Sequence, residues 1–262
     1  MNRKFRRTPD FDIVLDVKND RFIAPPREAQ RNWLLNRAVS EFADDLKQLD
    51  KIAARFVPGR DSQRIDERTH TELTDEDIME DWQIPLMRAM AAVATESHGD
   101  LLEIGFGRGV SASIIQEMGV RSHTIVECNE SVIERFHQWK PSYLGREIHL
   151  LEGRWQDVTD QFAEYDSIFF HTYPLNEEEY LEQALNSATF AEHFFPTASR
   201  YLRPGGVFTY MTNEIDSLSR AHQRALLRHF RSFRVQVLPL ELPGSVRDAW
   251  WADSMVIVRA EK

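Results

Sequence analysis

Three glycines stand close together where an apolar run gives way to a helical pattern. They are Gly105, Gly107 and Gly109, in the stretch LLEIGFGRG at residues 101–109. Glycine lets the backbone approach a ligand closely, and the amino end of the following helix favours negative or polar groups. Val110 stands where the dinucleotide fingerprint G-x-G-x-x-G requires a glycine. The turn therefore favours a ligand without a pyrophosphate, while a tight structural corner is the alternative explanation.

Polar and aromatic residues follow the next two β-type runs. Glu127 ends TIVEC, where its carboxylate can accept hydrogen bonds from both hydroxyls of a ribose. Trp155, Gln156 and Asp157 suit an adenine through stacking and recognition of its edge. Glu103, inside an apolar strand, either orients the glycine loop, meets a cationic ligand group or forms a salt bridge. Together these residues predict a pocket for an adenosine with a cationic tail.

A histidine follows the fourth β-type run, in IFFHTYP. With an unperturbed pKa of about 6.5, a neutral imidazole of His171 could accept a proton from a nitrogen or oxygen. The alternative is that His171 only shapes the pocket. Tyr173 and Pro174 are expected to wall the same pocket. Trp82 is expected near the reacting group, with a core role equally open.

Seven β-type runs and the helical stretches between them must position these residues. Their alternation predicts an α/β fold with a Rossmann-like, mostly parallel sheet covered on both faces. No convincing helix separates the last two runs, which predicts an antiparallel pair at one edge. Ligands bind at the carboxyl ends of parallel strands, so the site residues should converge on one rim. The runs are LLEIGF, SHTIVEC, EIHLLEG, YDSIFFH, GGVFTYM, RVQVLPLEL and SMVIVRA.

The first part of the chain differs in character from the rest. Residues 1–74 are predicted to form a helical extension ahead of a domain at residues 75–262. Apolar residues recur at three- and four-residue steps over residues 27–57, which predicts an amphipathic helix that either packs on the domain or covers a cleft as a lid. Residues 59–70 are predicted to be a solvated connector, and no strand is expected in this region.

A second helical pattern begins after Thr74. Threonine is a good N-cap, and acidic residues fill the first turn that follows it. Pro85 interrupts the pattern, so a short turn followed by a separate helix is expected.

Composition narrows the class of protein. The 262 residues carry a formal net charge of -10, which argues against a nucleic-acid backbone as the main partner. No apolar run approaches membrane-spanning length. The single cysteine, Cys128, cannot form an internal disulfide, so a reducing cytoplasm is the simplest compartment. The histidines show no spacing typical of a metal site.

Several of these stretches resemble one family. The sequence is similar to class I S-adenosylmethionine-dependent methyltransferases, and more narrowly to guanidinoacetate N-methyltransferase, over roughly residues 78–262. The resemblance implies a seven-stranded methyltransferase sheet with S-adenosylmethionine as cofactor. The motifs that carry it are MEDWQIPLM, LLEIGFGRG, IVECNESVIERFHQW, LEGRWQDV, YDSIFFHTYPLNEEE and YLRPGGVFTYM. The cofactor-binding residues that it implies are Glu103, Gly105, Phe106, Gly107, Gly109, Glu127, Cys128, Asn129, Trp155, Gln156 and Asp157. The residues expected to line the acceptor side are Trp82, Gln83, Met87, His171, Thr172, Tyr173, Trp250 and Trp251.

The sequence departs from this family where the family binds its guanidinium group. The family's carboxylate in W-E-x-P and its aspartate before T-Y-P correspond to Gln83 and His171. Two charge-assisted hydrogen bonds, each worth about 1.5–3 kcal/mol, are therefore missing. Guanidinoacetate is disfavoured as the acceptor.

The sequence thus predicts methyl transfer to a nitrogen of another small molecule, in a setting such as natural-product biosynthesis. In this hypothesis His171 accepts the proton and Gln83 holds a neutral polar group. Trp250 and Trp251 either close over the acceptor or form a dimer contact. The alternatives are transfer to a hydroxyl or carboxylate, transfer to an arginine of a peptide or protein, and a catalytically silent cofactor-binding partner.

Overall fold

The computed structural model contains two compact units, Met1–Arg60 and Asp61–Lys262. In the first unit β1 (Val14–Asp16) pairs antiparallel with β2 (Arg21–Ile23), a hairpin that the sequence analysis did not predict. The predicted helix over residues 27–57 lies outside the described residues, and the boundary after residue 74 stays a prediction. The structure describes residues 14–16, 21–23, 68–176, 179, 183, 187–212, 214–243 and 252–262.

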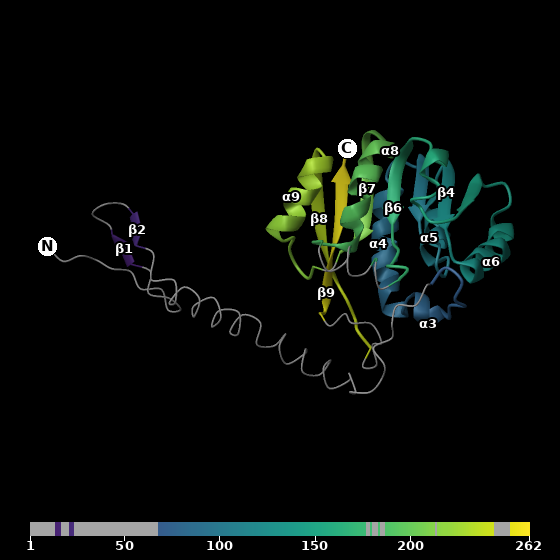
Figure 1. Cartoon of the computed structure of the whole chain (residues 1–262), viewed down its shortest axis with the longest axis horizontal. Coiled ribbons are helices and arrows are strands. Elements are labelled where there is room, and N and C mark those ends of the chain that lie inside the picture. Colours follow the sequence, from purple (N-terminus) through teal and green to yellow (C-terminus); the bar gives the residue numbers. More distant parts are fainter. Residues whose placement is uncertain are drawn as a thin grey trace. The chain divides into compact units, whose positions relative to one another are not determined.

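The second unit is built on one seven-stranded sheet in the order β5-β4-β3-β6-β7-β9-β8 (Figure 1). The first five strands in that order run parallel, and β9 runs antiparallel to both of its neighbours. The predicted α/β class and antiparallel edge pair are therefore confirmed, with the last strand inserted beside β7. The strands are β3 (Asp100–Ile104), β4 (Ser122–Glu127), β5 (Ile148–Glu152), β6 (Tyr165–Phe170), β7 (Leu202–Met211), β8 (Ser232–Pro239) and β9 (Ser254–Glu261).

Helices and short 3-10 turns connect the strands. The helices are α3 (Asp75–Ile78), α4 (Ile84–Ala94), α5 (Val110–Met118), α6 (Glu130–Trp139), α8 (Phe195–Tyr201) and α9 (Arg220–His229). The 3-10 turns are η1 (Asp81–Gln83), η2 (Lys140–Tyr143), η3 (Thr159–Gln161) and η5 (Phe190–Phe194).

The predicted helix starts are present. The Thr74 hydroxyl accepts a hydrogen bond from the Asp77 backbone N–H at 3.3 Å, and the Asp77 carboxylate accepts one from the Thr74 N–H at 3.0 Å. This reciprocal capping begins α3, as the N-cap signal indicated. Pro85 lies in the first turn of α4, where its missing N–H leaves no helical hydrogen bond unmade.

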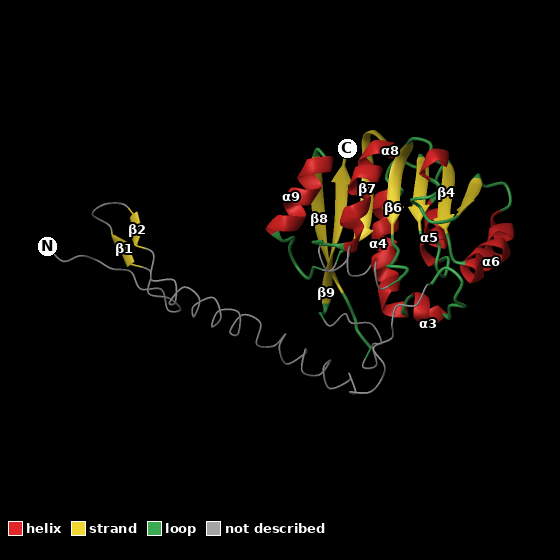
Figure 2. Cartoon of the chain, in the orientation of Figure 1, coloured by secondary structure: helices red, strands yellow, loops and turns green. Residues whose placement is uncertain are grey.

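Apolar side chains alternate between the two faces of the sheet, and helices cover both faces (Figure 2). On β3, Leu102 and Ile104 join the core under α8 and α9, whereas Leu101 joins the core under α4 and α5. This period of two follows from the pleat of a strand that is buried on both sides. The helices thereby leave the ends of the strands free to carry polar groups.

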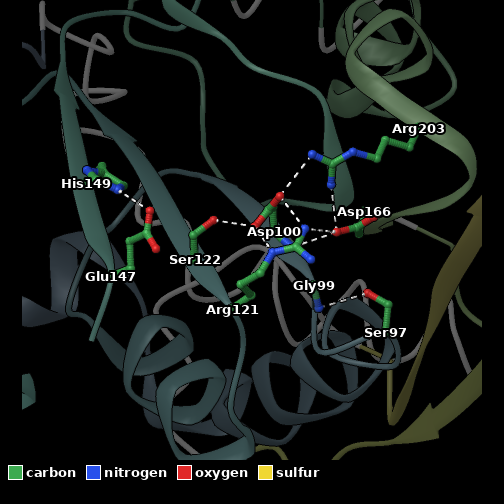
Figure 3. A network of polar contacts seen from close by, with 9 residues as sticks. All are labelled: Ser97, Gly99, Asp100, Arg121, Ser122, Glu147, His149, Asp166 and Arg203. Carbon is green, nitrogen blue, oxygen red and sulfur yellow. Dashed lines mark hydrogen bonds and ion pairs between the residues drawn. The ribbon is translucent and has the colours of Figure 1, made fainter. Parts of the chain in front are cut away.

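The amino ends of the central strands carry an ion-pair network (Figure 3). Asp166, at the start of β6, accepts hydrogen bonds from the Asp100 N–H at 2.8 Å and from Arg203 at 2.7 Å. Arg121 donates to both carboxylate oxygens of Asp100, at 2.7 and 2.5 Å, and this hydrogen bonding lowers the pKa of that carboxyl. The network joins β3, β4, β6 and β7 at one rim. The cavities that could bind a ligand lie at the opposite rim, at the carboxyl ends of the strands.

Candidate active site

Two adjoining cavities open at the carboxyl ends of β3, β4 and β6. The larger has a volume of about 690 Å³ and extends over the glycine turn. The smaller has a volume of about 380 Å³ and extends toward the loop after β5. The two cavities therefore adjoin along a shared wall. The residues that line both cavities are Gly105, Glu127, Cys128, Thr172, Tyr173 and Leu175.

The glycine turn holds a backbone shape that other residues rarely adopt. Gly105, Gly107 and Gly109 have φ values of 91°, 55° and 72°. A Cβ on Gly105 would lie 2.3 Å from the backbone oxygen of His171, so β3 and β6 can approach only because this residue is glycine. Gly109 is the N-cap of α5. The three glycines are thus required by the packing of this corner as well as by any ligand above it.

Glu127 connects the glycine turn to the loop after β4. Its Oε2 accepts hydrogen bonds from the N–H groups of Phe106 at 2.9 Å and Gly107 at 3.4 Å. Its Oε1 accepts from the N–H groups of Cys128 at 2.8 Å and Asn129 at 2.9 Å. These four bonds use the roughly four lone-pair positions of a carboxylate. A ribose hydroxyl would therefore share or replace one of them, and the long bond from Gly107 is the weakest.

The neighbours of Glu127 shape the larger cavity. Phe106 is buried and packs edge-to-face on Phe136, with the ring centroids 5.4 Å apart. Burial, and next the Glu127 carboxylate, raise the pKa of the Cys128 thiol to about 12, so this thiol is neutral and unsuited to nucleophilic attack. Asn129 caps α6 by accepting a hydrogen bond from the Val132 N–H at 3.0 Å.

The smaller cavity has an aromatic end. Trp155 lines it and packs on Phe194 and His193, with centroid distances of 4.9 and 5.6 Å. Gln156 also lines it. Asp157, by contrast, is exposed and lines neither cavity, so the structure does not bring it together with the other predicted residues.

The sequence analysis missed an ion pair in this wall. Glu179 is buried, and its Oε1 accepts a hydrogen bond from Arg154 Nη2 at 2.5 Å, while its Oε2 accepts one from the Leu175 N–H at 2.8 Å. The pair joins the loops after β5 and β6 across the smaller cavity. The run EEE at residues 177–179 was visible, but it does not indicate which glutamate turns inward.

His171 lies in the wall of the larger cavity. Its Nε2 atom is buried and has no hydrogen-bond partner among the described residues. Burial lowers the pKa of the imidazole to about 4, so the ring is neutral at neutral pH. The ring of Tyr173 lies 5.6 Å away, centroid to centroid, and its hydroxyl accepts a hydrogen bond from Gln83 Nε2 at 3.3 Å. The structure therefore brings these three predicted acceptor residues together.

Other predicted acceptor residues lie elsewhere. Trp82 and Met87 are buried in the core on the α4 side of the sheet, and neither lines either of the two cavities described above. The core alternative for Trp82 is the one that this packing supports, and the expectation that Met87 faces the acceptor finds no support in the structure. Trp250 and Trp251 lie outside the described residues.

The cover of the larger cavity is residues 68–81, called the strap below. Residues of the strap that line the cavity are Arg68, Leu73, Asp77, Ile78 and Met79. Arg108, from the glycine turn, donates to the Met79 carbonyl at 3.1 Å and to Asp81 at 2.7 Å. Arg135 pairs with Asp75 and donates to the Leu73 carbonyl at 2.6 Å. The end of the predicted solvated connector is thus part of the site, which corrects that expectation.

The inserted antiparallel strand, the glycine turn and the acid at the end of β4 are features of one class of protein. Fold and site together define a class I S-adenosylmethionine-dependent methyltransferase. A group of His, Cys, Asp or Glu that could hold a metal ion does not occur in the described part of the chain, and none of its helices is long and apolar enough to cross a membrane.

Comparison with known proteins identifies the family. The profile of guanidinoacetate N-methyltransferase matches residues 60–241, more than half of the chain, and the chain belongs to that family. Protein arginine N-methyltransferase 2 of Eremothecium gossypii is 27% identical over 145 residues, covering 51% of this chain and 32% of that protein. The corresponding protein of Aspergillus fumigatus is 32% identical over 117 residues, covering 40% of this chain and 26% of that protein. The chain thus spans about a third or less of the length of these relatives.

The chain is also similar, at low sequence identity, to solved structures. The N-methyltransferase NodS from Bradyrhizobium japonicum, in complex with S-adenosyl-l-homocysteine, is 12% identical with a TM-score of 0.49, covering 70% of this chain and 88% of that chain. Spermidine synthase from Thermotoga maritima is 15% identical with a TM-score of 0.47, covering 68% of this chain and 59% of that chain.

The cofactor is S-adenosylmethionine, and the two cavities fit it. Trp155, an aromatic ring of the kind that stacks on an adenine, lines the smaller cavity, and Gly105, Gly107 and Ser111 line the larger cavity beside it. When bound, the cofactor supplies an electrophilic methyl group.

Proposed function

We propose that this methyltransferase acts on an uncharged nitrogen of a small molecule. The observation that carries the proposal is the neutral imidazole of His171, which lines the larger cavity and whose Nε2 has no hydrogen-bond partner among the described residues. The acids that line the cavities are already engaged. The Asp77 carboxylate accepts a hydrogen bond from the Thr74 hydroxyl, and the Glu127 carboxylate accepts hydrogen bonds from four backbone N–H groups. The Glu179 carboxylate accepts a hydrogen bond from Arg154. A guanidinium acceptor would find no free carboxylate among these side chains.

The low pKa of His171 refines its role. An imidazole with a pKa of about 4 is a poor acceptor for the proton of a methylated amine, because proton transfer is most efficient when the pKa lies near the working pH. We therefore assign His171 the task of holding the acceptor nitrogen by a hydrogen bond. Gln83, through the Tyr173 hydroxyl, holds the wall in place. Correct placement supplies most of the catalysis in an in-line methyl transfer.

Methylation of a protein arginine is the second candidate. It is favoured by the relatives, which are named protein arginine N-methyltransferase 2. It requires a guanidinium-binding carboxylate, for which the described cavity walls offer none that is unengaged. Transfer of a labelled methyl group separates the candidates, with guanidinoacetate, an arginine peptide, neutral amines and imidazoles, and a phenol as acceptors. Turnover of a neutral nitrogen compound alone supports the proposal, whereas preferred turnover of the arginine peptide contradicts it.

A gain-of-function variant sharpens this test. The double variant Gln83→Glu/His171→Asp restores acids at both positions, and each charge-assisted hydrogen bond is worth about 1.5–3 kcal/mol. We expect kcat/KM for guanidinoacetate to rise at least about tenfold. His193→Asp places an acid in the smaller cavity instead and is the matched control, for which no gain is expected.

A further inference from the structure

A chain of polar side chains is buried between the sheet and α5, among apolar neighbours. Glu103 and His123 are both 0% exposed. Glu103 Oε1 accepts a hydrogen bond from the Ser111 hydroxyl, and Glu103 Oε2 forms an ion-pair contact of 2.8 Å with His123 Nε2 that is not aligned as a hydrogen bond. The other imidazole nitrogen, Nδ1, lies 3.0 Å from Gln116 Nε2. The contacts therefore run from the first turn of α5 through β3 and β4 and back to the last turns of α5.

A buried polar chain of this kind adds little net stability, because the cost of removing charged or polar groups from water offsets their mutual attraction. Its value lies in orientation, since charged and polar groups packed against one another at 0% exposure hold their neighbours in one arrangement. One end of this network reaches the cofactor site. Ser111 lines the larger cavity, and Glu103 precedes Gly105 by two residues on the same strand.

We propose that His123 is a positioning residue for the cofactor. Through Glu103 it holds Ser111, and with it the first turn of α5, at the distance from the glycine turn that cofactor binding requires. His123 itself lines neither cavity, so any effect on binding must pass through Glu103. The inference depends on the cofactor site alone and is independent of the proposed acceptor.

Calorimetric titration with S-adenosylhomocysteine tests this role, at a temperature well below the Tm of every variant. His123→Leu leaves Glu103 without its partner, and we expect the Kd to rise roughly tenfold. His123→Gln keeps an N–H donor within reach of the carboxylate and should restore the Kd to within about threefold of the wild-type value. With a working acceptor, His123→Leu should raise KM for the cofactor more than it lowers kcat.

The matched control is His222→Leu. His222 is also 0% exposed, with Nε2 2.5 Å from the Tyr210 hydroxyl and Nδ1 3.4 Å from Glu214, yet it lines neither cavity. This variant should lower the Tm and leave the Kd unchanged. If His123→Leu does not fold, Gln116→Leu decides the question, with an expected rise in Kd of about threefold.

Two results would overturn the proposal: wild-type affinity in the folded His123 and Gln116 variants, or an equal loss of affinity in His222→Leu. The titration involves no acceptor. A wrong assignment of the acceptor would therefore show in the transfer assay and leave these binding constants untouched.

Discussion

The pH dependence of stability offers a direct test of the His171 environment. Its pKa falls from 6.5, the ordinary value, to about 4 in the folded chain. Below pH 6.5 the unfolded chain therefore binds a proton at this site that the folded chain excludes, and acidification favours unfolding. The stability that the folded chain keeps by holding this imidazole neutral is fully present above pH 6.5 and is lost as the pH falls toward 4. Each pKa unit corresponds to about 1.4 kcal/mol, so about 2 kcal/mol should be lost between pH 6.5 and pH 5.

Urea unfolding of the full chain at pH 7 and pH 5 measures this loss. All other titrating groups are shared by the wild type and His171→Asn, so they cancel in the difference between the two proteins. The wild type should lose about 2 kcal/mol more than the variant between these pH values. His149→Asn, which removes an exposed histidine, controls for the substitution itself. Equal losses in the wild type and His171→Asn would refute the argument that the imidazole is buried and neutral.

Three further substitutions probe the corner, the amino-end network and the strap. Gly105→Ala should lower the free energy of unfolding by about 2–5 kcal/mol in urea unfolding, because it combines backbone strain with a collision. Gly145 has a similar φ but no neighbour that a Cβ would meet, so the control Gly145→Ala should lower the free energy of unfolding by only about 1 kcal/mol. Asp166→Asn should lower the free energy of unfolding by about 1–3 kcal/mol while the Kd of S-adenosylhomocysteine stays unchanged, since its contacts lie at the opposite rim from the cavities. Asp75→Asn removes the acid that pairs with Arg108 and Arg135 and so weakens the ion pairs that hold the strap. Stopped-flow measurements should show faster release of S-adenosylhomocysteine from this variant than from the wild type at low salt, and the difference in rate should shrink at high salt.

Much of the site could be predicted from sequence because its signals are local. Glycines at alternate positions after an apolar run indicated the corner, and the structure shows the positive φ values that only glycine adopts readily. Strand and helix periods placed Glu127 and His171 at the carboxyl ends of two strands, which the structure shows on either side of β3. The missing acids at Gln83 and His171 were equally visible, because the resemblance to the family marks the two positions and the residue types there can be read directly.

Contacts between distant segments were decided by the tertiary structure. Four backbone N–H groups converge on Glu127, Asp157 turns toward solvent, and Glu179 turns inward to Arg154. The strap lines the larger cavity, although its first residues, 68–70, belong to a stretch whose sequence predicted a solvated connector. None of these outcomes has a periodic or compositional signal, because each depends on which groups the fold brings within hydrogen-bond distance.

The amino-acid sequence by itself determined the order of strands and helices along residues 100–262 and the glycine corner, since these depend on local conformational preference and residue type, and with the family resemblance it also showed the neutral residues Gln83 and His171 in place of two acids. The tertiary structure alone decided that β9 enters beside β7, that His171 is buried deeply enough to stay uncharged, and that His123 reaches the cofactor site through Glu103. The physical reason is that desolvation and long-range pairing arise only when segments far apart in the chain exclude water between them.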